Sequence, residues 1–128
     1  MDYVMDAMVN CQAELNSSPE EYLRYLNLQF EAENSRDYCF SKCLLKKLEF
    51  FDENVGFNIG NILKQVSNEP VEIIKAIDDT IQSCIKTNEP LKEDKSECEW
   101  VGQNFICIMS QYKDILMNSF ENHEHSRN

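Results

Sequence analysis

Glycine and proline are scarce in this chain of 128 residues, with three of each. An all-β fold needs many tight turns, which use these residues, so the composition argues against one. No apolar run approaches the roughly 18 residues that cross a bilayer, and we expect no membrane insertion. Basic residues are also few, and the net charge of −11 argues against nonspecific binding to nucleic acid or anionic lipid. The length fits one domain over 1–128, with a polar, frayed tail at 121–128.

The cysteines are the most informative residues that are present. There are six, and their spacing reads C-x27-C-x3-C-x40-C-x13-C-x8-C, from Cys11 to Cys107. An even count in a small chain predicts a disulfide framework and a secreted, extracellular protein. Cys39 and Cys43 share a helix face, whereas Cys98 and Cys107 would lie on opposite faces of another helix. The spacing alone leaves many pairings open.

Apolar residues recur with a helical period almost throughout, which predicts an all-α fold of about six helices. The first is expected over 2–15. Ser18-Pro19-Glu20-Glu21 predicts the start of the second, which carries residues through Phe30. Asn34 or Ser35 caps the third, which continues to Phe51, and 52–56 is expected as a loop. The fourth spans Ile59 to Val66, the fifth follows Pro70 through Ile85, and the sixth runs over 97–117 after a loop at 87–95.

This chain resembles the insect odorant-binding proteins, the pheromone- and general-odorant-binding family of six-cysteine type. The resemblance covers about residues 4–112 and depends on two fixed cysteine intervals of that family. These are the x3 interval at Cys39-Phe-Ser-Lys-Cys43 and the x8 interval at Cys98-Glu-Trp-Val-Gly-Gln-Asn-Phe-Ile-Cys107. It implies disulfides Cys11–Cys43, Cys39–Cys98 and Cys84–Cys107, which staple the helices around an internal apolar cavity.

The resemblance also implies which side chains line that cavity. They come from the apolar faces of the first, fourth, fifth and sixth helices. They are Val4, Met8, Ile59, Ile62, Leu63, Val66, Ile77, Ile81, Phe105, Ile108 and Tyr112. For any single apolar member, ordinary core packing is the alternative. Tyr112 is the candidate hydrogen-bonding tip, and Trp100 is expected to be a packed residue.

The chemistry of an enzyme or metal site is not indicated. His123 and His125 lie in the polar tail, and Cys39 and Cys43 have no second ligand pair of the kind that zinc sites use. The sequence contains no P-loop, GxSxG or HExxH motif. We therefore expect no catalysis, metal or cofactor.

The expected function is that of a secreted carrier, which reversibly binds and solubilises an odorant, pheromone or fatty acid. Two alternatives remain. One is a salivary-type scavenger of host mediators such as biogenic amines, and the other is a secreted interaction protein that acts through its surface. The expected partners are a small hydrophobic ligand and, as a further candidate, a chemosensory receptor. The expected oligomeric state is a monomer or a weak homodimer.

Overall fold

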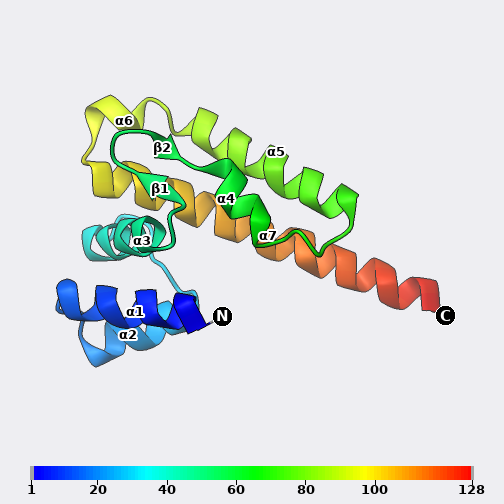
Figure 1. Ribbon diagram of the computed structural model, residues 1–128, viewed down its shortest axis with the longest axis horizontal. Coiled ribbons are helices and arrows are strands. Elements are labelled where there is room, and N and C mark those ends of the chain that lie inside the picture. Colours follow the sequence, from blue (N-terminus) through cyan, green and yellow to red (C-terminus); the bar gives the residue numbers. More distant parts are fainter. Residues whose placement is uncertain (1, 128) are drawn as a thin grey trace.

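The computed structural model describes the backbone of residues 2–127 and the side chains of residues 3–115. This part of the chain contains seven helices and one short β-hairpin (Figure 1). The elements are α1 (Asp2–Glu14), α2 (Pro19–Leu26), α3 (Ser35–Lys47), β1 (Phe51–Asp52), β2 (Gly56–Phe57), α4 (Ile59–Lys64), α5 (Val71–Thr87), α6 (Leu91–Asp94) and α7 (Glu97–Arg127). The all-α prediction is confirmed. Within the described range, no helix is both long enough and apolar enough to cross a bilayer.

Two predicted helix starts are confirmed by their capping bonds. At α2, the Ser18 hydroxyl accepts from the Glu21 backbone N–H at 3.1 Å, and the Glu21 carboxylate accepts from the Ser18 N–H at 2.9 Å. These bonds satisfy backbone donors that the first turn of a helix leaves unpaired. At α3, the Asn34 side chain accepts from the Asp37 N–H at 3.1 Å.

Three predicted helices are too long at their C-terminal ends. α2 stops at Leu26, so Phe30 lies in the linker before α3. α3 stops at Lys47, and Glu49 adopts a φ of 63°, a left-handed conformation that ends the helix before Phe51. α4 stops at Lys64, so Val66 lies in the turn that follows.

Two expected loops contain regular structure, and the last helix is longer than predicted. Phe51–Asp52 pairs with Gly56–Phe57 as a two-stranded antiparallel ladder around the expected turn. The short helix α6 lies within the expected loop at 87–95. α7 continues to Arg127, ten residues beyond the predicted end at 117.

The long helix α7 is the axis of the molecule. In Figure 1, α3 lies on one side of it and α5 on another, while α1 and α2 lie beyond α3. The crossing with α3 is close: a Cβ at Gly102 would lie 2.7 Å from the Tyr38 Cα, which is nearer than real Cβ atoms approach. Glycine at 102 therefore lets the two backbones meet.

Three disulfides connect these helices in the pairing that the resemblance implies. Cys11–Cys43 joins α1 to α3, Cys39–Cys98 joins α3 to the start of α7, and Cys84–Cys107 joins α5 to the middle of α7. Together, the three disulfides link α1, α3, α7 and α5 covalently to one another. The hairpin and α4 lie in the segment between Cys43 and Cys84, which carries no cysteine of its own.

Candidate ligand-binding site

The contacts of α7 with α3 and α5 show which of its faces points into the molecule. Cys98 and Gly102 face α3. Cys107 and Asn104 face α5, because Cys107 is bonded to Cys84 and the Asn104 amide oxygen accepts from Asn88 at 3.1 Å. These two faces lie roughly a third to a half of a turn apart on the helix.

Val101, Ile108 and Tyr112 lie on the strip of α7 between those two faces. Val101 is fully buried near the start of the helix, whereas Ile108 and Tyr112 are half-buried further along. The strip therefore changes from packed core to partly accessible surface along α7. Burial raises the pKa of the Tyr112 hydroxyl, and the negative charge of Glu69 raises it further, so this hydroxyl remains a hydrogen-bond donor at neutral pH.

Some of the sequence-predicted residues lie in the packed core. Met8, Ile77, Ile81 and Phe105 are buried. Met8 and Phe105 belong to one apolar cluster with aromatic residues of α2, α3 and α7, and Val4 packs against that cluster. The predicted apolar faces of α1 and α5 thus point inward.

The predicted ligand contacts on α4 are less buried than Met8, Ile77 and Ile81. All six residues of this helix are described and none is fully buried. Ile59, Ile62, Leu63 and, in the next turn, Val66 are each half-buried. Apolar side chains that remain partly accessible are the kind of surface that an apolar ligand covers.

A groove of about 300 Å³ lies between the α2–α3 linker and α7. Its apolar wall is made by Leu28, Phe30, Phe105, Ile106 and Met109, and its polar end by Ser110, Lys113 and Asp114. Of the predicted ligand contacts, Phe105 is the one that lines it. Sequence reasoning missed the others because it placed Phe30 in a helix. The apolar pair at 105 and 109, four residues apart, was the available signal.

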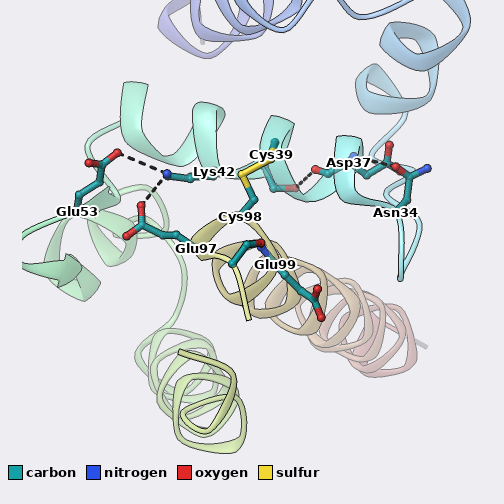
Figure 2. Close-up of a disulfide and its surroundings, with 10 residues drawn as sticks. Asn34, Asp37, Cys39, Lys42, Glu53, Glu97, Cys98 and Glu99 are labelled. Atoms are coloured by element: carbon teal, nitrogen blue, oxygen red, sulfur yellow. Dashed lines mark hydrogen bonds and ion pairs between the residues drawn. A yellow bond between two sulfur atoms is a disulfide. The ribbon is translucent and has the colours of Figure 1, made fainter. Parts of the chain in front are cut away.

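A second hollow, of about 450 Å³, lies over the Cys39–Cys98 disulfide and is lined partly by lysines of α3. Figure 2 shows Lys42 reaching from α3 between two carboxylates next to this disulfide. The Lys42 ammonium lies 2.6 Å from the Glu97 carboxylate and 3.5 Å from that of Glu53. Because the Lys42 ammonium is already paired with two carboxylates, we assign it a structural role: it connects α3, the hairpin and α7.

A buried carboxylate holds the linker that covers the aromatic cluster. Asp37 is fully buried and accepts two bonds from the Arg24 guanidinium, at 2.9 and 3.0 Å. It also accepts from the Tyr25 hydroxyl at 2.7 Å and the Glu31 N–H at 2.8 Å. Burial alone would raise the pKa of Asp37, but these bonds outweigh it and hold the pKa below its ordinary value.

Trp100 is buried, as expected for a packed residue. Its ring meets Phe51 and Phe57 of the hairpin edge-on, with centroids 5.7 and 5.5 Å away, and the Lys92 ammonium lies 5.3 Å from the ring centroid. The hairpin is therefore attached to α7 through aromatic packing. The side chains of His123 and His125 lie outside the described residues.

A model of the PBP/GOBP family matches residues 1–111 of this sequence. The chain belongs to the PBP/GOBP family. The match spans the six cysteines, α4 and the part of α7 that carries Val101 and Ile108, and it ends one residue before Tyr112. The half-buried apolar side chains of α4 and Ile108 of α7 therefore lie within the part of the chain that matches the family.

Two characterised relatives agree with the PBP/GOBP assignment. General odorant-binding protein 99a of Drosophila melanogaster is 26% identical over 78 residues, which cover 61% of this chain and 53% of the relative. Odorant-binding protein 22 of Aedes aegypti is 21% identical over 112 residues, which cover 87% of this chain and 75% of the relative. In its alignment with the Drosophila protein, this chain spans about half the length of that relative.

Proposed function

We propose that this protein is a secreted carrier that reversibly binds and solubilises a small hydrophobic ligand such as an odorant, a pheromone or a fatty acid. In this proposal the ligand lies against the half-buried apolar side chains of α4 and α7. The observation that carries the proposal is the half-buried apolar surface of α4, together with Ile108 and Tyr112 on the inward strip of α7.

The energetics of such a ligand are adequate. Removing ten methylenes from water contributes roughly 8 kcal/mol of transfer free energy at about 0.8 kcal/mol each. Association costs reduce this gain, and micromolar affinity requires about 8 kcal/mol net. A medium-length chain that also contacts the aromatic side chains therefore marks the lower limit of ligand size.

The disulfides fit a carrier without covalent chemistry. All six cysteines are paired, so no thiol of this chain is available as a nucleophile. Each bridge restricts the unfolded chain and adds roughly 2–4 kcal/mol of stability. That added stability offsets the cost of keeping an apolar space unfilled when no ligand is bound.

The test measures how tightly an apolar naphthylamine fluorophore binds to the purified protein and to a variant whose new side chain fills the proposed ligand space. Ile108→Trp places a large ring on the inward strip of α7. We expect it to weaken fluorophore binding by about tenfold or more. Val71→Trp is the matched control, because Val71 is 79% exposed at the start of α5. Equal binding by both variants, with circular dichroism unchanged, would place the ligand elsewhere.

A further inference from the structure

The groove between the α2–α3 linker and α7 lies on a different face of α7 from the inward strip. Ile106 lines the groove, whereas Ile108 lies on the strip, and two residues correspond to about 200° of rotation around a helix. The face that meets α3, marked by Cys98 and Gly102, lies between them. The described residues that line the groove come from the linker and α7 and not from α4 or α5. The groove is therefore separate from the half-buried surface of α4.

The apolar wall of the groove is built on two aromatic rings. Phe30 meets Phe105 edge-on, with ring centroids 5.0 Å apart, and stacks on Tyr25 at 5.1 Å. Phe30 and Met109 are half-buried, and Leu28 is 43% exposed. The wall thus presents apolar surface that is fixed by packing from behind and still partly accessible from outside, which is the surface that an apolar chain can cover.

The linker that forms one side of the groove is held in place on both sides of Phe30. Before it, the Gln29 carbonyl accepts from the Arg24 guanidinium at 3.0 Å. After it, the Glu31 N–H donates to the buried Asp37 carboxylate at 2.8 Å. The groove is therefore formed before any ligand arrives, and little ordering of the backbone is needed on binding.

One lysine continues the apolar wall into the polar end of the groove. Ile106, Met109 and Lys113 follow at i, i+3 and i+7, so they share one face of α7. Long side chains on a helix lean toward its N-terminus, which brings the Lys113 ammonium back over Met109. Asp114 lies about 100° further around the helix, at the edge of this face. The charge in line with the apolar wall is therefore positive.

Lys113 differs from the lysines of the other large hollow. Each of the three lysines that line the hollow over the Cys39–Cys98 disulfide lies within 2.7 Å of a glutamate carboxylate. Among the side chains that the structure describes, Lys113 takes part in no ion pair. Its ammonium can therefore donate to an anionic group at the end of the groove without breaking a bond within the protein.

We propose that this groove is a second ligand site, which takes a single medium-length alkyl chain that ends in a carboxylate. The chain lies along Phe30, Phe105 and Met109, and the carboxylate accepts from the Lys113 ammonium and the Ser110 hydroxyl. The volume of about 300 Å³ is at the lower end of ligand pockets, which suits one narrow chain. This site is independent of ligand binding at α4.

The test is an NMR titration of the protein carrying methyl-labelled methionine, with octanoate and octan-1-ol as ligands at neutral pH. Met109 lines the groove, so its methyl signal reports occupancy there. We expect octanoate to move this signal in a saturable way. Lys113→Gln should weaken octanoate about fivefold, the size of effect that an exposed ion pair supports, and leave octan-1-ol unchanged. Lys86→Gln is the matched control, because it removes the same charge from an exposed site on α5.

Two tryptophan variants separate the groove from the α4 site. Ile106→Trp fills the groove, so it should abolish the response of Met109 and leave the naphthylamine fluorophore bound, and Ile108→Trp should do the reverse. If octanoate does not move the Met109 signal, or if Lys113→Gln and Lys86→Gln weaken it equally, the groove site is refuted and the carrier function stands. If Ile106→Trp alone removes the fluorophore, the groove is the main ligand site and the proposed location at α4 fails.

Discussion

Replacing Asp37 should destabilise the protein more than replacing any other single carboxylate that the structure describes. Its side chain is fully buried and accepts four hydrogen bonds, two from Arg24 and one each from the Tyr25 hydroxyl and the Glu31 N–H. Asp37→Ala would leave the buried Tyr25 phenol without its acceptor, and the half-buried Arg24 guanidinium with the Gln29 carbonyl at 3.0 Å and the Glu31 carboxylate at 3.7 Å as its remaining partners. Removing one partner of a buried ion pair costs about 3–5 kcal/mol.

The lower part of that range applies here, because the Arg24 side chain is 26% exposed and water can partly replace its acceptor. We expect a loss of about 3 kcal/mol in the free energy of unfolding for Asp37→Ala, and about 2 kcal/mol for Asp37→Asn, which keeps one oxygen acceptor. The assay is urea unfolding at pH 7 with the disulfides intact, followed by the fluorescence of Trp100. Asp6→Asn on the exposed side of α1 is the control and should change stability by less than about 0.5 kcal/mol.

The pH dependence gives a second check on the same carboxylate. The pKa of Asp37 is lowered in the folded protein from an ordinary value of 3.8, so the ionised form stabilises the fold. This stabilisation is complete above pH 3.8 and is lost as the pH falls through the lower folded-state pKa. The difference between the wild type and Asp37→Asn should therefore be constant near neutrality and shrink in acid. A difference below about 1 kcal/mol at pH 7, or one that persists undiminished in strong acid, would refute the reasoning.

Three further predictions follow from single features of the fold. Gly102→Ala should lower the thermal midpoint clearly, because the added Cβ would meet Tyr38 where α3 crosses α7; an unchanged midpoint by calorimetry would contradict the close crossing. Removing the Cys39–Cys98 bridge by a double Ser substitution should cost about 4 kcal/mol on the chain-entropy account, since it closes a loop of 59 residues, and urea unfolding measures the loss. The pKa of Glu21, lowered to about 2 chiefly by its hydrogen bonds with Arg36, should appear in a carboxyl NMR titration; a value near 4.5 would mean that the pair does not form in solution.

The fold could be predicted where local signals agree with the tertiary structure. Ser18, Pro19 and Glu21 specify a helix start through bonds within four residues of sequence, and the structure forms those bonds. Helix ends were predicted less well because distant residues decide them. The linker holding Phe30 leaves the helical path at Leu28, whose φ is 58°, and Asp37, six residues beyond Glu31, then holds it through the Glu31 N–H. A buried ion pair of this kind carries no hydrophobic signal in the sequence.

The candidate site was predicted only in part, for a related reason. Helical periodicity correctly pointed Ile77 and Ile81 inward, and both are buried. Periodicity gives the face of a helix but not whether the face meets other side chains or an unfilled space. The half-buried state of Ile62 and the groove beside Phe105 depend on how closely α4 and the linker approach α7, which is a property of packing across the whole fold.

The disulfide pattern predicts which helix opens most readily and where a ligand enters. The bridges connect α1, α3, α5 and α7, whereas α4 is held by noncovalent contacts such as the bond from the Asn61 amide to the Glu49 carbonyl and the bond between Tyr3 and Gln65. A six-residue helix with half-buried side chains has few apolar contacts to lose when it opens. We therefore expect α4 amides to exchange with deuterium faster than those of α3 and α5, and to slow when decan-1-ol is bound. Exchange of α4 as slow as that of α3, or protection by ligand confined to the α2–α3 linker, would mean that ligands enter beside Phe30 and not past α4.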